Sequence, residues 1–442
     1  MTTKRLNRYG IYAFCLVISF CSLISSCANQ PSTATDFAVE SDRLVLVNFA
    51  SKAEVNSWQT SQNYTYASQN WRRPLGIHRP IQELEAEYSI SVVDEWPIDS
   101  LELYCVVFAI PDNQSADSIL EQLNADDRIA FAEPMETFEL LTASSAKPLL
   151  DNASGISEVQ EEAQFLNDPL LGVQHPNTFS WLQELHVMST GSSVRVGIID
   201  SGIDTKHPDL LGRLRAKRSL LNDNLTSSFE HGTAVAGIIG AIAGNQEGIA
   251  GLVPDANLYS YESCGALNGS TFCDSFTLAK ALEYALRDKL HVLNLSLAGP
   301  RTPLLEALIN QHLQAGTIIV AAQSANIRQG FPANIEGVIS VNSEMANGFW
   351  FANEEQFTTE AGGGYRFFYG TSMSAAAVTG FSAALASEYE KSKVMAIMQS
   401  LSRNDCDDDL FQIISETPLA QKVIDRLCHP DAHFFSATTS TL

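Results

Sequence analysis

The stretch Val194-Arg-Val-Gly-Ile-Ile-Asp200-Ser-Gly-Ile-Asp204 decides the fold of this chain. Its first six residues are almost all apolar, its seventh is an acid, and a glycine turn follows. Short apolar runs without polar alternation are typical of strands that a parallel sheet buries on both faces. The carboxyl ends of such strands are where open parallel sheets present their functional groups. The stretch therefore predicts a buried parallel strand that delivers Asp200 to a functional site.

Similar apolar runs recur through the second half of the chain, and segments rich in small residues separate them. Strands that alternate with helical segments indicate βαβ units, in which helices cover both faces of a parallel sheet. We therefore predict an α/β domain over residues 166–400. Its further strands are expected at Leu258–Tyr261, Val292–Leu297, Thr317–Ala322 and Val338–Val341.

Two more polar side chains stand at the starts of expected helices. His231 opens His231-Gly-Thr-Ala-Val-Ala-Gly237, and Ser372 lies in Tyr369-Gly-Thr-Ser372-Met-Ser-Ala-Ala-Ala. A serine hydroxyl becomes an effective nucleophile when an imidazole removes its proton and a buried carboxylate orients that imidazole. A helix start also offers unpaired backbone N–H groups to a developing oxyanion. Together with Asp200, the two side chains have the composition of a hydrolytic triad.

These motifs, in the order Asp, His, Ser, resemble those of the subtilisin-like serine proteases (peptidase S8) over roughly residues 166–390. The resemblance implies a subtilisin-like fold in which Asp200 orients the imidazole, His231 is the general base and acid, and Ser372 is the nucleophile. It implies no required cofactor. It also assigns a wall of the substrate pocket to Ser296, Leu297, Ala298 and Gly299.

The loop expected to supply the oxyanion amide departs from the family's Ala-Ala-Gly-Asn. Here it reads Val320-Ala-Ala-Gln-Ser-Ala-Asn326. An ungapped alignment puts Ala325 at the Asn position, whereas a one-residue insertion restores Asn326, which we favour. Gln323 is the alternative donor. Loss of such a donor typically lowers kcat by about 10²–10³, so a chain with Ala325 there would be slow rather than inactive.

Three oxygen-bearing side chains, Gln174, Asp209 and Asn245, match positions that bind a structural calcium in some members of the family. Carboxylate and amide oxygens are the ligands that calcium prefers. The alternative is a solvated acid beside two loop amides. The sequence has no Cys/His cluster with zinc spacing, no Walker loop and no dinucleotide-binding fingerprint.

The first 27 residues have the pattern of an export signal. A basic segment precedes an apolar stretch at residues 9–24, which is too short for an ordinary membrane span. The stretch Leu23-Ile-Ser-Ser-Cys27 resembles the bacterial lipobox, which implies removal of residues 1–26 and lipidation of Cys27. Ala28 at the next position favours the outer membrane. The alternative is a plain signal peptide that is cleaved nearby.

The remaining cysteines fit an exported protein. Cys264 and Cys273 flank a short polar loop, and Cys406 and Cys428 lie in the C-terminal tail, so we expect two local disulfides. Cys105 lies in an apolar strand pattern, and we expect it to be a buried free thiol.

Residues 42–140 are expected to form a separate, small α+β domain. Their pattern of strand, helix and strand resembles the inhibitory propeptides of subtilisin-like proteases; the alternative is an unrelated α+β cap. We expect strands at Leu44–Phe49, Leu103–Ile110 and Ile129–Leu140 and a helix at Ser115–Leu123. The connecting parts are a linker at 27–41, a linker with the processing site at 141–165, and a C-terminal extension at 401–442 with a helix near Leu419–Leu427.

Composition narrows the function classes further. The chain has 442 residues, 45% of them hydrophobic, which is enough for two or three packed domains. Its formal net charge of −24 argues against nucleic acid as a partner. Residues 28–165 hold 23 acidic and only 7 basic side chains, so the acidity is concentrated in the N-terminal domain.

These observations predict an exported endopeptidase that is anchored by lipid in the bacterial envelope and is made as an autoinhibited precursor. Its expected partners are protein or peptide substrates, its own prodomain and the membrane. Processing in the linker would separate the lipid from the catalytic domain. The alternative from a different class is a catalytically silent subtilisin-fold protein that acts as an envelope binding or scaffold protein.

Overall fold

The computed structural model describes most of the two predicted domains. Its described residues are 42–51, 73–141, 167–174, 179–222, 225–324, 330–342, 349–350, 355–402 and 421–424. Outside them lie Cys27, Asn326, Cys406, Cys428 and most of the helix expected at Leu419–Leu427.

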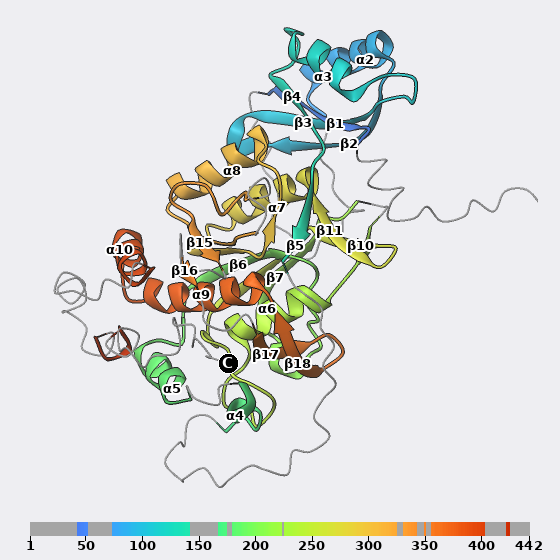
Figure 1. Cartoon of the computed structure of the whole chain (residues 1–442). Coiled ribbons are helices and arrows are strands. Elements are labelled where there is room, and N and C mark those ends of the chain that lie inside the picture. The colour runs from blue at the N-terminus through green and yellow to red at the C-terminus, as the bar shows by residue number, and fades with distance from the viewer. Residues whose placement is uncertain are drawn as a thin grey trace, which may run out of the picture.

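A seven-stranded sheet forms the centre of the larger domain (Figure 1). In spatial order its strands are β16 (Phe349–Trp350), β15 (Ile339–Asn342), β14 (Ile318–Ala322), β12 (Val292–Leu295), β6 (Arg195–Asp200), β9 (Asn257–Glu262) and β7 (Leu214–Ser219). All neighbouring strands in it are parallel. The predicted α/β class is therefore confirmed. Strand β7 was not predicted, because its sequence alternates charged and apolar residues as an edge strand does.

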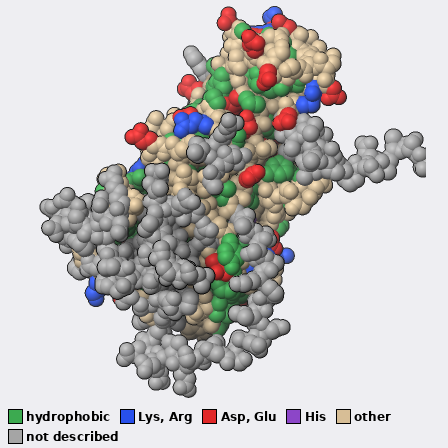
Figure 2. Space-filling view, viewed as in Figure 1, with side chains coloured by type: hydrophobic (Ala, Val, Ile, Leu, Met, Phe, Trp, Pro, Cys, Tyr) green, Lys and Arg blue, Asp and Glu red, His purple; other side chains and the backbone are tan. Residues whose placement is uncertain are grey.

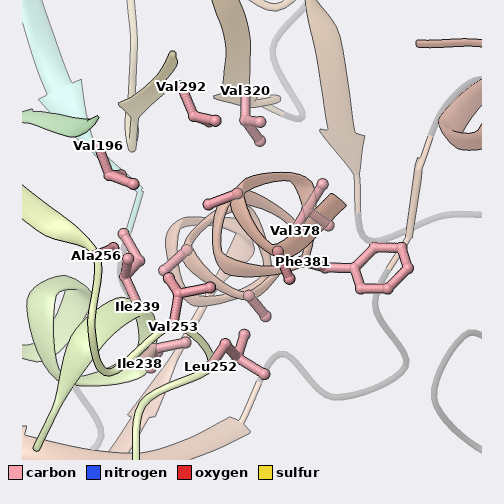
Figure 3. Packing of buried hydrophobic residues seen from close by; sticks show 14 of the residues in the cluster. Val196, Ile238, Ile239, Leu252, Val253, Ala256, Val292, Val320, Val378 and Phe381 are labelled. Carbon is pink, nitrogen blue, oxygen red and sulfur yellow. The ribbon is translucent and has the colours of Figure 1, made fainter. Parts of the chain in front are cut away.

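Four helices cover the two faces of this sheet. One face carries α6 (Glu230–Gly240) and α9 (Thr371–Ala386), and the other carries α7 (Ser275–Arg287) and α8 (Pro303–Gln314). Successive residues of a strand point to opposite faces. Val292 and Val320 point toward α9, as Figure 3 shows, whereas Leu293 and Ile319 belong to the cluster around α7 and α8. The continuous apolar strands are thus buried on both sides.

Residues 44–134 contain a second, antiparallel sheet. Its strands, in spatial order, are β2 (Ser91–Ile98), β3 (Leu103–Ala109), β1 (Leu44–Ala50) and β4 (Phe131–Pro134). Val45, Val47 and Phe49 alternate along β1 and pack on the helices α2 (Leu75–Tyr88) and α3 (Ala116–Asn124). Helix α2 was not predicted, because Pro80 interrupts its helical pattern, and β2 was not predicted either.

The opposite face of this small sheet packs on α7 and α8, so these two helices lie between the two sheets (Figure 1). Leu46, Trp96 and Val107 of the small sheet share one apolar cluster with Phe276 and Leu304 of the helices. Full burial of a large apolar side chain contributes about 1.5–3 kcal/mol. The N-terminal domain is therefore held as a packed layer of the molecule.

The single strand predicted at Ile129–Leu140 is wrong, because this segment forms two strands with different partners. Strand β4 stays in the small sheet and ends at a proline, which has no N–H to continue the ladder. Strand β5 (Thr137–Leu140) leaves that sheet and lies between β11 (Ser270–Asp274) and β13 (Leu297–Ala298). The strand predicted at Val292–Leu297 divides in the same way, since β12 ends at Leu295 and β13 follows in the sheet that contains β5.

The remaining described elements surround this arrangement. They are η2 (Asp99–Leu101), α4 (Leu171–Gln174), α5 (Phe179–Met188), η3 (Pro208–Leu210), β8 (Thr226–Ser227), β10 (Cys264–Leu267), β17 (Glu355–Glu360), β18 (Gly364–Tyr369) and α10 (Lys391–Ser402). No helix in the described part of the chain is both long and apolar enough to cross a bilayer. Figure 2 shows more acidic than basic side chains on the visible face of the N-terminal domain.

Candidate active site

Asp200 and His231 meet at the carboxyl edge of the large sheet. Asp200 ends β6 and is fully buried, and His231 lies in the first turn of α6. The Nδ1 atom of His231 lies 2.7 Å from Oδ1 of Asp200 and 2.9 Å from Oδ2. The Ser201 N–H donates to the same Oδ1 at 2.6 Å. A carboxylate in this position keeps the imidazole proton on Nδ1 and leaves Nε2 free to accept another proton.

The close approach of α6 to the end of β6 depends on a residue without a side chain. A Cβ atom on Gly232 would lie 2.6 Å from the carbonyl oxygens of Ser201 and Gly202, which is closer than backbone tolerates. The Gly232 N–H also donates to Oγ of Ser201 at 2.9 Å. The glycine after His231 therefore lets the helix start pack against the loop that follows the strand.

Ser372 lies in the first turn of α9, which packs against α6. Its Oγ donates to the carbonyl oxygen of Ser296 at 3.0 Å, and Oγ of Ser296 donates to the Ser372 carbonyl at 3.1 Å. The Nε2 atom of His231 is buried and has no hydrogen-bond partner among the described residues. The structure thus brings Asp200 and His231 into direct contact, but it does not join His231 to Ser372 by a hydrogen bond.

Strand β5 of the N-terminal domain runs past Ser372 as the second strand of a five-stranded sheet with the order β13-β5-β11-β10-β8. Both of its neighbours pair with it in antiparallel fashion. Just after β5, the Leu141 N–H donates to the Ser296 carbonyl, and the Ser372 N–H donates to the Leu141 carbonyl, each at 3.4 Å. The Leu141 carbonyl therefore lies at the N-terminus of α9, beside the candidate nucleophile.

The side chain of Phe138, which belongs to this strand, is fully buried. A Cβ atom on Gly299 would lie 2.3 Å from the Phe138 ring, so the ring can pack this closely on residue 299 only because that residue has no side chain. The ring of Phe331 meets Phe138 edge-on, with 6.1 Å between the ring centroids. All four predicted wall residues, Ser296–Gly299, thus pair with or contact the strand.

The two candidates for the oxyanion amide remain predictions. The Ser340 hydroxyl donates to Oε1 of Gln323 at 3.3 Å, so that amide oxygen is held against β15. The Thr371 hydroxyl donates to the Gln323 carbonyl at 3.2 Å. Asn326 lies outside the described residues. Within the described part of the chain, the N–H of Ser372 is the donor placed at the Leu141 carbonyl.

The predicted calcium ligand Asp209 already accepts hydrogen bonds on both of its oxygens. Oδ1 accepts from Nδ2 of Asn245 at 2.8 Å. Oδ2 accepts the Ile249 N–H at 2.9 Å and the Tyr365 hydroxyl at 3.0 Å. Three protein donors thus occupy most of the acceptor positions of this carboxylate.

The other two predicted ligands are engaged in the same way. The side-chain oxygen of Asn245 accepts the Glu247 N–H at 2.9 Å, and Oε1 of Gln174 accepts the Ala250 N–H at 3.2 Å. Calcium needs about six to eight oxygen ligands. The donor set around Asp209 does not fit it, and the described residues hold no cluster of three or more metal-binding side chains. The alternative of loop amides around an acid describes this site better, although the acid is buried rather than solvated.

Cys264 and Cys273 form a disulfide across β10 and β11, with their Cα atoms 4.0 Å apart. The disulfide ties together the hairpin whose second strand pairs with β5. Cys105 is a buried free thiol, as predicted, and burial raises its pKa.

Sequence reasoning missed two buried charged residues between the domains. Glu133 of β4 is 3% exposed, its Oε2 accepts the Leu304 N–H at 3.1 Å, and its Oε1 has no hydrogen-bond partner in the described residues. Burial raises the pKa of Glu133 to about 7. Lys280 of α7 is also fully buried, 3.4 Å from Asp94 of the small sheet, and burial lowers its pKa. Their only signal in the sequence is a charge inside an otherwise apolar pattern.

Part of the chain is similar to a known protein family. Residues 191–348 match the Peptidase_S8 pattern of the subtilase family, a range that includes Asp200 and His231 and ends before Ser372. Over 300 residues the chain is 29% identical to the thermostable alkaline protease of Halalkalibacterium halodurans, which covers 63% of this chain and 80% of that protein.

A second relative, subtilisin E of Bacillus subtilis, is 30% identical over 224 residues, and the match spans 45% of this chain and only 57% of subtilisin E. Among solved structures, fervidolysin from Fervidobacterium pennivorans, a keratinolytic enzyme related to subtilisin, superposes with a TM-score of 0.57 at 17% identity. That superposition covers 81% of this chain and 57% of fervidolysin, and it shows a shared fold. Residues 191–348 of the chain are therefore similar to the subtilase family, and the fold is shared with fervidolysin.

Proposed function

We propose that this chain is a serine endopeptidase that cleaves proteins in the cell envelope or outside the cell and is made as an autoinhibited precursor. In this proposal, Nε2 of His231 takes the proton of the Ser372 hydroxyl as Oγ attacks the substrate carbonyl carbon. Asp200 holds the imidazolium, and the Ser372 N–H stabilises the oxyanion. His231 then protonates the leaving amine, and water hydrolyses the acyl-enzyme by the same steps.

The observation that carries the proposal is the position of the Leu141 carbonyl. Strand β5 pairs on one side with β11 and on the other with β13, and the carbonyl of Leu141, just after it, accepts the N–H of Ser372. A bound substrate needs this arrangement, because its scissile carbonyl must lie beside both the nucleophile and an oxyanion donor. The distance of 3.4 Å leaves room for this bond to shorten as charge develops on the oxygen.

One side chain must move before the reaction in this proposal. The hydroxyl of Ser372 donates to the Ser296 carbonyl, whereas attack requires it to donate to Nε2 of His231. Rotation about the Cα–Cβ bond moves Oγ between staggered positions. The rotation exchanges one hydrogen bond for another, so its net cost is about 1 kcal/mol or less.

A fluorophosphonate probe tests the proposed nucleophile directly. We expect the processed chain to be labelled at Ser372, and the Ser372→Ala variant to take up no label. The control variant Ser374→Ala removes a buried hydroxyl two residues further along the same helix and should be labelled like the wild type. Absence of labelling after confirmed removal of residues 42–141 would favour the alternative function, a binding or scaffold protein of the envelope.

The proposal divides the chain into an inhibitory prodomain at 42–141, a linker up to 165, and a catalytic domain at 166–400. We propose that self-cleavage occurs at the Leu141–Thr142 bond, and that the prodomain then remains in the cleft as a bound product. The contacts with α7, α8, β11 and β13 support this role, since they would survive the cut.

We also propose that Cys27 carries the lipid, on the support of its lipobox-like sequence. Because the lipid lies on the prodomain side of the cut, processing would free the catalytic domain once the two parts separate. Fatty-acid labelling followed by fractionation tests this point. Label that remains covalently attached to the catalytic half after processing would contradict it.

Burial of Glu133 predicts that prodomain binding weakens as the pH rises. The pKa of this carboxyl is about 7 in the docked domain, whereas its ordinary value is 4.5, so docking takes up a proton between these values. The contribution of Glu133 to the docking free energy is fully present below pH 4.5, and it is lost as the pH rises through about 7. Affinity should fall by about 10² across this window, since each pKa unit is a factor of ten.

The activity released on dilution of the cleaved complex measures this effect at a series of pH values. Burial raises the pKa of Glu136 too and adds to the trend, whereas the lowered pKa of Lys280 opposes it. We expect Glu133→Gln to remove most of the pH dependence and the exposed control Glu139→Gln to preserve it. An unchanged profile for Glu133→Gln would assign the dependence to other groups.

A further inference from the structure

The segment in the cleft makes contacts further upstream than the four residues next to the Leu141 carbonyl. Thr137, the fifth residue back from the scissile position, pairs with Asp274 at the end of β11. Glu136, the sixth, lies beyond β5 and meets Ser275, the first residue of α7. The Ser275 N–H donates to the Glu136 carbonyl at 2.9 Å, and the Glu136 N–H donates to Oγ of Ser275 at 3.2 Å.

This reciprocal pair closes the N-terminus of α7. A helix leaves its first N–H groups without partners inside the helix. In α7, the side chain of Asp274 accepts the Thr277 N–H at 2.7 Å, and the Thr277 hydroxyl faces back to the Asp274 N–H at 3.3 Å. The N–H of Ser275 is instead paired with the strand in the cleft. When that strand leaves, one donor and one acceptor of Ser275 lose their partners.

Two features hold Ser275 in register with the cleft. The disulfide between Cys264 and Cys273 ties β10 to β11 immediately before the helix. The capping residue Asp274 is fully buried, and Ser275 itself is fully buried while the segment is bound. A rigid, desolvated position of this kind favours a hydrogen bond over exchange with water.

We propose that Ser275 is a specificity-determining residue that anchors the backbone of the sixth residue upstream of the scissile bond. The inference rests on the proposed peptidase function, because it takes the prodomain segment as a guide to substrate binding. Because the main-chain atoms of this substrate residue make the contacts, a longer extended substrate should bind more tightly whatever side chain it has at this position.

Two peptides with a reporter after the last leucine isolate this contact in the processed enzyme. Acetyl-Thr-Phe-Glu-Leu-Leu keeps the carbonyl that accepts the Ser275 N–H, since its acetyl group replaces the Glu136 carbonyl. Acetyl-Glu-Thr-Phe-Glu-Leu-Leu adds the N–H that donates to the Ser275 hydroxyl. We expect the longer peptide to have a kcat/KM about fivefold higher, the contribution of one such hydrogen bond.

The variant Ser275→Ala should remove this advantage and leave the shorter peptide unaffected, and Ser275→Thr, which keeps a hydroxyl, should restore it. Ser270→Ala on the exposed tip of the same hairpin is the control. A peptide with Ala in place of the added Glu should gain as much as the original. Equal losses for both peptides in Ser275→Ala, or an advantage that survives that variant, would overturn the proposal.

A second measurement does not depend on catalysis. In the unprocessed Ser372→Ala chain, the segment 135–141 stays in the cleft, and its amide hydrogen exchange can be followed by mass spectrometry. Added Ser275→Ala should speed exchange in this segment, whereas added Ser270→Ala should not. If neither peptide is hydrolysed, the proposed peptidase function is wrong, but the exchange measurement still tests whether Ser275 anchors the segment. Unchanged exchange in the chain with Ser275→Ala would overturn the proposed role of Ser275.

Discussion

Replacement of Asp200 by asparagine should lower kcat for peptide hydrolysis by about 10⁴ while the fold is retained. The carboxylate accepts the proton on Nδ1 of His231 at 2.7 Å, which leaves Nε2 as the base. An amide at this position can donate its own N–H to Nδ1 and so favours the tautomer with the proton on Nε2. That tautomer cannot take the proton of Ser372, and the imidazolium also loses its counter-charge.

Steady-state kinetics on one peptide substrate, together with the rate of fluorophosphonate labelling, measure this loss. Asparagine has nearly the shape of aspartate, so circular dichroism and the melting temperature should change little. The matched control is Glu230→Gln. Glu230 is the neighbouring acid on α6; it pairs with Arg366 and does not touch the imidazole of His231. An Asp200→Asn enzyme within tenfold of the wild type would show that another group orients His231.

The second large effect concerns the proposed cleavage site. We expect Leu141→Asp to slow self-cleavage at the Leu141–Thr142 bond by about 10³, because a carboxylate would replace an apolar side chain that packs on an apolar cluster. Leu141 is half-buried and packs on the apolar cluster around α6 and α9. N-terminal sequencing of the mature protein should read Thr142 first in the wild type and in the control Leu141→Met.

Two outcomes would contradict this assignment. Processing of Leu141→Asp at the wild-type rate and position would mean that the Leu141 side chain does not occupy the specificity pocket. A mature wild-type chain that begins elsewhere in residues 142–166, in a sample that has never been exposed to other proteases, would mean that the bond beside Ser372 is not the one cut.

Residues that local sequence controls could be predicted. Asp200 ends a buried strand and His231 begins a helix of small residues, and both positions follow from patterns within about ten residues. The central strands of the large sheet were predicted to within a few residues for the same reason. The contact of 2.7 Å between His231 and Asp200 forms only when the whole sheet is folded. The order of the motifs in the sequence nevertheless indicated that these two residues are partners.

Features that depend on distant partners could not be predicted. Strand β5 pairs with strands more than a hundred residues away, so its partners could not be predicted, although Pro134 marks the end of β4 locally. The hydroxyl of Ser372 donates to the Ser296 carbonyl, and this partner depends on one side-chain rotation that the sequence does not determine. The hydrogen bonds around Asp209 could not be predicted either, because the Tyr365 hydroxyl, supplied by β18, reaches Asp209 from a remote part of the chain. The burial of charged residues such as Glu133 could not be predicted, because it depends on the packing of the small sheet against α7 and α8.

The missing side chain at Gly299 has a consequence for how such a protein can evolve. In the proposed precursor, residue 299 contacts Phe138 of the prodomain, and after processing the same residue would contact the substrate. A mutation that changes the space beside residue 299 to suit a new substrate would also weaken the packing of Phe138 and so the binding of the prodomain. A change of substrate preference at residue 299 would therefore require a compensating change at residue 138.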